Sequence, residues 1–211
     1  YNCAFSTFMR LPKQEWFDSF YEQVWDVLSQ KDIEARCNAP YTALFELLKP
    51  FLDRKDKKIL DMGCGYGGAM MRFKERGFQN IYGLELSNKR FEFCRNIGLE
   101  VVNCPFENII ETDFFKKNGP FDIVYSWHVL EHIPDLEKVM VTLGKVLRPG
   151  GVVFFSVPNI YQEPLFHLAH FLPHVHAFSP KSLAMLLSKH SFEIFSCNGD
   201  IGVVGILKDR K

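Results

Sequence analysis

The sequence lacks the features that mark several special classes of protein. No apolar run approaches the ~18 residues of a membrane-spanning helix, and the first residues carry no signal-peptide pattern. Lysine plus arginine number 25, as do aspartate plus glutamate, so no net charge draws the chain toward nucleic acid or an anionic membrane. We therefore expect a small-molecule substrate, and neither nucleic acid nor a membrane as a partner.

The cysteines are scattered along the chain. The six cysteines stand at positions 3, 37, 64, 94, 104 and 197, with no C-x-x-C pair and no zinc-finger spacing. This pattern predicts reduced thiols in a cytoplasmic protein. The chain starts at Tyr1 rather than at methionine, from which we expect a domain of a larger polypeptide with neighbouring domains.

The order of the elements predicts the fold class. From residue 57 onward, continuous apolar segments alternate with segments of helical periodicity. Strands are predicted at 57–62, 79–84, 99–102, 121–127 and 151–157, with helices at 68–76, 87–96 and 135–147; a helix at 180–189 and strands at 192–197 and 203–208 follow. This alternation predicts an α/β protein with a Rossmann-like doubly wound sheet, mostly parallel with an antiparallel last strand.

The residues before the first strand predict a helical cap. Apolar residues recur at helical spacing over 13–30, and a second helix is predicted over 40–48 with Pro40 in its first turn. These helices either pack on the sheet or cover a ligand. We expect one domain over 1–211, with a cap over 1–50 and a core over 57–211 that contains an insertion at about 158–190.

The stretch 58–68 predicts a ligand-binding loop. An apolar strand runs into Gly63, Gly65 and Gly67, and the missing Cβ atoms let the backbone turn sharply and a ligand approach it. A helix that starts here would direct its first N–H groups at that ligand. The spacing also fits G-x-G-x-x-G, a dinucleotide pattern. However, Asp61 would face the pyrophosphate, and its carboxylate better suits an amine or a cation.

Glu85 follows the second predicted strand, 17 residues after the last glycine of the loop. A carboxylate at this position can accept hydrogen bonds from both ribose hydroxyls of an adenosine ligand. Several adenosine cofactors use such a carboxylate. Glu85 therefore predicts adenosine without choosing the cofactor.

Four blocks of sequence carry a family resemblance. They are Asp61-Met-Gly-Cys-Gly-Tyr-Gly, Phe121-Asp-Ile-Val-Tyr-Ser-Trp-His-Val-Leu-Glu-His, Leu147-Arg-Pro-Gly-Gly-Val-Val and Ser156-Val-Pro-Asn. In this order and spacing, they resemble the class I methyltransferases that depend on S-adenosylmethionine (SAM). The resemblance covers about residues 57–195 and falls in the small-molecule branch, which includes ubiquinone-pathway and sugar O- and N-methyltransferases.

The resemblance implies SAM as the cofactor and a set of residues that bind it. By analogy these are Asp61, Gly63, Cys64, Gly65, Tyr66, Gly67, Glu85, Leu86, Phe106, Ser126 and Trp127. The chain departs from the family in the adenine loop, where Cys104 or Pro105 falls at a position that is commonly acidic. Relatives use the segment matching 158–190 to shape the acceptor pocket.

Two histidines are candidates for a general base. A hydroxyl acceptor gains from a base with a pKa near neutral, and His128 and His132 follow the fourth predicted strand. Packing is the alternative role for both. Some ubiquinone-pathway relatives have a cation site at positions matching Glu131 and His132. His128 stands where they have a second glutamate, so we predict no metal.

Four further histidines, at positions 167, 170, 174 and 176, lie in the predicted insertion. His167 and His170 are spaced to share a helix face, but no third residue has convincing spacing for a metal. We interpret all four as surface or packed residues.

These patterns predict a SAM-dependent methyltransferase that acts at oxygen on a small polar acceptor, such as a sugar, a nucleotide-sugar or a quinone-like compound. Two alternatives stay open at this point. One is a non-catalytic module of the same fold within a larger polypeptide. The other is an NAD-dependent dehydrogenase, favoured by Gly63, Gly65 and Gly68 and disfavoured by Asp61.

Overall fold

The computed structural model describes residues 5–7, 28–161, 174–198 and 202–208. Most of the predicted helix 13–30 lies outside the described residues, as do His167 and His170. Within the described ranges, no helix has both the length and the apolar character needed to cross a membrane.

A seven-stranded sheet forms the centre of the molecule, in the order β4-β3-β2-β5-β6-β9-β8. Its strands are β2 (Ile59–Met62), β3 (Ile81–Leu84), β4 (Glu100–Val102), β5 (Phe121–Trp127), β6 (Leu147–Ser156), β8 (Phe192–Asn198) and β9 (Gly202–Leu207). The first five are parallel, β9 is antiparallel to β6, and β8 and β9 form an antiparallel pair. The predicted Rossmann-like sheet with an antiparallel last strand is confirmed.

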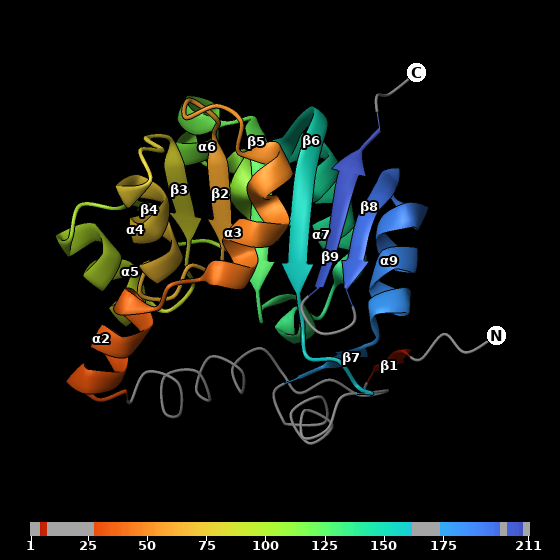
Figure 1. Cartoon of the computed structure of the whole chain (residues 1–211), viewed down its shortest axis with the longest axis horizontal. Coiled ribbons are helices and arrows are strands. Elements are labelled where there is room, and N and C mark those ends of the chain that lie inside the picture. Colours follow the sequence, from red (N-terminus) through yellow and green to blue (C-terminus); the bar gives the residue numbers. More distant parts are fainter. Residues whose placement is uncertain (1–4, 8–27, 162–173, 199–201, 209–211) are drawn as a thin grey trace.

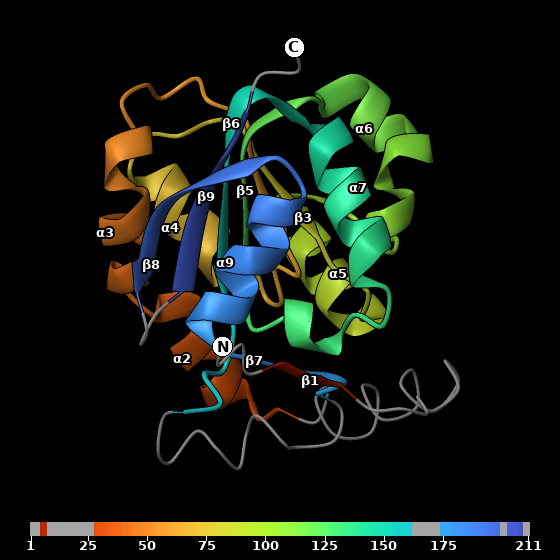
Figure 2. The same ribbon diagram turned by 90° about the vertical axis from the view of Figure 1, so that its right-hand side faces the viewer.

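Helices cover both faces of the sheet (Figure 2). One apolar cluster joins α3 (Thr42–Leu48), α4 (Gly68–Glu75) and α5 (Asn88–Asn96) to the sheet. The other joins η3 (Phe106–Glu111), α7 (Leu136–Val146) and α9 (Pro180–Lys189) to the opposite face. The central strands are therefore buried on both sides, which explains their continuous apolar runs.

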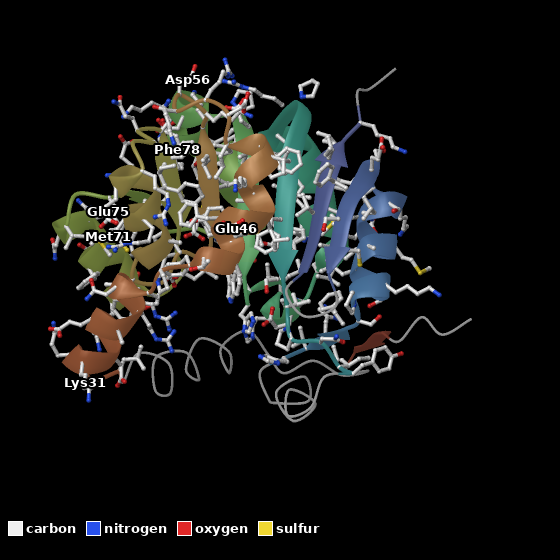
Figure 3. The ribbon with its side chains drawn as sticks, in the orientation of Figure 1. Lys31, Glu46, Asp56, Met71, Glu75 and Phe78 are labelled. Carbon is white, nitrogen blue, oxygen red and sulfur yellow. The ribbon has the colours of Figure 1, made fainter. Side chains whose placement is uncertain are left out.

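Side-chain directions agree with this layering. Lys31, Glu46 and Glu75 are exposed on α2 (Gln30–Asn38), α3 and α4 (Figure 3). Phe78, just after α4, is buried and packs edge-to-face on Phe73 with ring centroids 5.6 Å apart.

The N-terminal helices differ in part from the prediction. The sequence analysis did not predict α2. Ser29 caps this helix by accepting a hydrogen bond from the N–H of Asp32. α3 is close to the predicted helix 40–48, but Pro40 is not in its first turn. Tyr41 adopts a left-handed conformation, with φ 50°, and separates the proline from the helix. A short 3-10 turn, η2 (Lys49–Phe51), continues from α3.

Two other segments also depart from the prediction. The stretch after β4, predicted as a loop, contains η3 and α6 (Asp113–Asn118), and the Thr112 hydroxyl accepts from the Phe115 N–H at the start of α6. The strand predicted at 151–157 begins earlier, and residues 148–151 form a bulge inside β6, because Phe121 pairs with Leu147 whereas Ile123 pairs with Val152.

A small second ribbon lies at the carboxyl edge of the sheet. β1 (Phe5–Thr7) pairs antiparallel with β7 (His176–Phe178). The arrowheads of β2, β3, β5 and β6 point toward this ribbon and toward α2 (Figure 1). Ligand sites in sheets of this kind lie at this edge, near the point where the strand order reverses. Here that point lies between β2 and β5.

Candidate functional site

The glycine loop joins β2 to α4 in the predicted manner. Gly63, Gly65 and Gly67 have φ values of 86°, 57° and 75°, in the left-handed region that favours glycine. The N–H groups of Gly63 and Cys64 both donate to the Leu84 carbonyl of β3, at 2.8 and 2.9 Å. The loop is thereby held against the end of the neighbouring strand.

Gly65 and Gly63 have different surroundings. A Cβ on Gly63 would collide with the side chain of Val129, so the loop packs tightly on the chain that follows β5. A Cβ on Gly65 would meet nothing within 4 Å. Gly65 therefore faces open space, as expected where a ligand approaches the backbone.

Asp61 is buried at the end of β2 and hydrogen-bonded to one tyrosine. The Tyr125 hydroxyl donates to Asp61 Oδ2 at 2.7 Å. Burial, with a smaller contribution from the charge of Glu85, raises the pKa of the Asp61 carboxyl to about 7, although the Tyr125 bond opposes the shift. A cationic group beside Asp61 would stabilise the ionised carboxylate and so would itself be held there.

Glu85 holds the loop from the other side. Its Oε2 accepts from the Gly65 N–H at 2.8 Å, and its Oε1 accepts from the Ser87 N–H at 2.9 Å. The Arg90 guanidinium lies 3.9 Å from Oε1. Each carboxylate oxygen can accept a second hydrogen bond.

A cavity with a volume of about 160 Å³, partly open to solvent, lies over the loop. The described residues that line it are Leu28, Arg36, Tyr41, Leu44, Asp61, Gly63, Cys64, Gly65, Tyr66, Gly68, Ala69, Arg90, Tyr125 and Trp127. Six of the predicted cofactor residues are therefore brought together: Asp61, Gly63, Cys64, Gly65, Tyr66 and Trp127.

The other predicted cofactor residues are not among those lining residues. Gly67 caps the start of α4. Glu85 accepts a hydrogen bond from the N–H of Gly65, which lines the cavity. Leu86 is 58% exposed, whereas Phe106 and Ser126 are buried in the interior. Their contact with a cofactor stays a prediction.

The sequence analysis did not identify several lining residues on the helical cap. Arg36, Tyr41 and Leu44 of α2, α3 and the link between them border the cavity. The Tyr41 hydroxyl donates to the Arg36 carbonyl at 3.1 Å, and a Cβ on Gly68 would collide with both groups. The cap thus packs on the sheet and also borders the cavity.

His128 follows Trp127, which lines the cavity, but is not itself one of the described lining residues. It has a left-handed backbone, with φ 54°, and its ring lies nearly parallel to that of Trp127 with centroids 6.1 Å apart. The side chain is accessible, yet the protein atoms around it remove part of its hydration and lower its pKa. A neutral imidazole at pH 7 can accept a proton, as a general base requires.

His132 is the last residue of the 3-10 turn η4 (Leu130–His132). Its Nε2 lies 3.9 Å from Glu131 Oε1, and its ring meets that of His174 with centroids 4.6 Å apart. Glu131 is 1% exposed, and burial raises the pKa of its carboxyl to about 8. Sequence spacing did not indicate the approach of His174, which lies 42 residues after His132.

Comparison with known proteins identifies the family. A family described as a methyltransferase domain matches residues 31–196, which is most of the chain. The protein therefore belongs to this methyltransferase domain family, and its fold is that of the class I SAM-dependent methyltransferases.

Individual relatives agree with this assignment. A ubiquinone biosynthesis O-methyltransferase of Erwinia tasmaniensis is 35% identical over 105 residues, which cover 49% of this chain and 43% of that protein. The match thus spans less than half the length of the relative. Among solved structures, a SAM-dependent methyltransferase of Thermotoga maritima, described as a possible histamine N-methyltransferase, has a TM-score of 0.67 and 18% identity, covering 93% and 100% of the two chains.

A second solved structure matches to a similar extent. It is the methyltransferase in a complex with the Haloferax volcanii Trm112 activator, with a TM-score of 0.71 and 13% identity, covering 92% and 98% of the two chains. At these identities the two structures show the fold alone.

The residues of the cavity fit SAM. Its amine suits the buried Asp61 carboxylate, and the space over Gly65 admits a close approach to the backbone. When bound, SAM supplies a methyl group already activated by its sulfonium centre. The protein's own residues bind and orient the two reactants, since the reaction depends mainly on in-line geometry.

Proposed function

We propose that this protein methylates a hydroxyl oxygen of a small, quinone-like aromatic acceptor. The observation that carries the proposal is the position of His128, accessible and next to Trp127 at the edge of the cofactor cavity. The relatedness to proteins named ubiquinone biosynthesis O-methyltransferase supports an aromatic acceptor and oxygen as the methylated atom.

The chemistry requires removal of the hydroxyl proton as oxygen attacks the methyl carbon. A phenolic hydroxyl has a pKa near 10, compared with a neutral imidazole that accepts a proton near pH 6.5. His128 is proposed to accept that proton at a ring nitrogen. The imidazole then returns the proton to solvent, and the chain itself is unchanged at the end of the cycle.

The test is a methyl-transfer assay with a panel of acceptors. The protein would be incubated with SAM and an ortho-dihydroxybenzene, an unsubstituted sugar or a nucleotide-sugar, and S-adenosylhomocysteine and the mass of each acceptor would be measured. We expect one added methyl group on the dihydroxybenzene. Methylation of only the sugar compounds would contradict the aromatic acceptor, and binding of SAM without transfer to any acceptor would favour the non-catalytic module.

His128→Asn tests the base. We expect kcat to fall by ~10²–10⁴-fold, the usual contribution of general-base catalysis, with the Kd for S-adenosylhomocysteine unchanged. His190→Asn is the matched control, since His190 lies beside Glu137 at the end of α9. An unchanged kcat in His128→Asn would rule out His128 as the base.

A further inference from the structure

Arg90 is a buried cation that borders the cofactor cavity. It stands in the first turn of α5, where its N–H donates at 3.3 Å to the hydroxyl of Ser87, the residue that caps the helix. Its side chain is only 15% exposed, and it is one of the described residues that line the cavity. No sequence pattern marked Arg90, because a single arginine in a helix is usually a solvated surface residue.

The guanidinium of Arg90 approaches the carboxylate of Glu85. Arg90 Nη1 lies 3.9 Å from Glu85 Oε1, the oxygen that also accepts from the Ser87 N–H at 2.9 Å. The Glu85 side chain is 8% exposed, so both charges lie largely out of water. Solvent and salt screen such a pair much less than a pair on the surface. The charge of Arg90 therefore acts on Glu85 with little screening.

Other bonds fix the position of Glu85 from two sides. The Gly65 N–H of the glycine loop donates to Oε2 at 2.8 Å. The side-chain amide of Asn103, just after β4, donates to the carbonyls of Glu85 and Leu86, at 2.9 Å each. These donors are neutral amides. Among the described contacts of Glu85, Arg90 is therefore the one that brings a full positive charge.

We propose that Arg90 is a positioning residue of the cofactor site, which orients the Glu85 carboxylate toward the ribose hydroxyls of the cofactor. With Oε2 held by the loop, and Oε1 held by Arg90 and the helix cap, the carboxylate cannot rotate without breaking a contact on each side. Its remaining acceptor positions then keep one direction. This role uses the predicted contact between Glu85 and the ribose, and it does not depend on the proposed acceptor.

A double-mutant cycle tests whether Arg90 acts through Glu85. The Kd for S-adenosylhomocysteine would be measured by calorimetry for the parent, Arg90→Ala, Glu85→Gln and the double variant. We expect Arg90→Ala to raise Kd about tenfold, which lies within the usual coupling between residues in contact. In the Glu85→Gln background the same change should alter Kd by less than about twofold, because the carboxylate that Arg90 orients is gone. Effects that multiply in the double variant would overturn the proposal.

A cofactor analogue gives a readout that a purely structural role would not change. The 2′-deoxy analogue of S-adenosylhomocysteine lacks one of the two hydroxyls that Glu85 is predicted to bind. The parent should prefer S-adenosylhomocysteine over this analogue by about tenfold, the value of one charge-assisted hydrogen bond, and Arg90→Ala should lose most of this preference. If Arg90 only stabilised α5, both ligands would weaken equally. A preference that persists in Arg90→Ala, or that is absent from the parent, would contradict the proposed role.

Two control variants separate the charge of Arg90 from the stability of its helix. Arg90→Lys keeps a positive charge beside Glu85. Since the observed contact is a single N–O approach rather than a two-bond pair, affinity should stay within about threefold of the parent. Arg95 lies on the same helix, is 58% exposed and pairs with Glu92 at 3.4 Å, so Arg95→Ala should leave Kd unchanged. A loss of affinity in Arg95→Ala as large as in Arg90→Ala would exclude a specific role for Arg90. All of these measurements concern binding, so a failure of methyl transfer would leave them unaffected.

Discussion

At the scale of single residues, Asp61 has the clearest consequence for cofactor binding. Its pKa of about 7 means that it is largely neutral in the free protein below pH 7. Because the folded-state pKa lies above the unfolded value of about 3.9, the stability contributed by the neutral Asp61 carboxyl falls as pH rises from about 4 and is lost by about pH 7. A bound amine has the opposite effect on the Asp61 pKa, because it favours the ionised carboxylate over the neutral carboxyl.

Cofactor affinity should therefore rise with pH. Between pH 8 and pH 6 the ionised fraction of Asp61 falls roughly tenfold, and the Kd for S-adenosylhomocysteine should rise by about the same factor. Calorimetry across this range measures it. Asp61→Asn should bind more weakly and lose most of the pH dependence. A Kd that does not change with pH in the parent would show that Asp61 does not hold the amine.

Tyr125 influences the pKa of the same carboxyl group. Its hydroxyl bond lowers the pKa of Asp61, opposing the effect of burial. In Tyr125→Phe that pKa should rise further, so the pH at which cofactor affinity reaches its plateau should move upward. A plateau at the same pH as in the parent would contradict this coupling.

Gly65 offers a matched test of the loop. Gly65 and Gly77 both have a left-handed backbone, with φ of 57° and 86°, and a Cβ on either would meet nothing within 4 Å. Alanine should therefore cost a similar ~1–2 kcal/mol of backbone strain at both positions. Only Gly65→Ala should weaken S-adenosylhomocysteine, by at least about tenfold or ~1.4 kcal/mol, because Gly65 lines the cavity. Equal affinity in the two variants would mean that the ligand does not approach this loop.

At the scale of elements, α9 depends on a buried cap. The Ser179 hydroxyl accepts from the Ser182 N–H, and the Ser182 hydroxyl in turn accepts from the Ser179 N–H at 2.9 Å. Ser179→Ala should lower the free energy of unfolding by ~1 kcal/mol, the usual cost of losing a cap. Urea denaturation measures this loss, and cofactor affinity should not change, because α9 lies on the face of the sheet opposite α3 and α4.

The elements that the sequence predicted well are those with a strong apolar pattern. Strand 121–127 and helix 180–189 have the predicted bounds because every residue of β5 is buried or half-buried and α9 has an apolar face. α2 was missed for the opposite reason. Only Ile33 of α2 is buried, so no apolar periodicity marks the helix, and its cap at Ser29 is its main sequence signal.

At the scale of the whole molecule, the cap, the glycine loop and the end of β5 converge on one cavity. Cofactor binding should therefore stabilise the described fold as a unit. At S-adenosylhomocysteine concentrations of 100 times Kd, linkage adds ~2.7 kcal/mol, which a thermal melt would register as a higher Tm. NADH at the same concentration should leave Tm unchanged. The reverse result would revive the dehydrogenase alternative.

The sequence by itself determined the sheet and the loop, whereas the cofactor class came from its resemblance to a family. These features follow from local pattern, since apolar runs, glycines and Asp61 act through residues close to them in the chain. Only the tertiary structure placed Arg36 and Tyr41 at the cavity and brought His174 to Glu131. Such contacts join segments far apart in the sequence, and no spacing rule specifies them. They arise because the packing of helices and ribbon against the carboxyl edge of the sheet decides which side chains meet there.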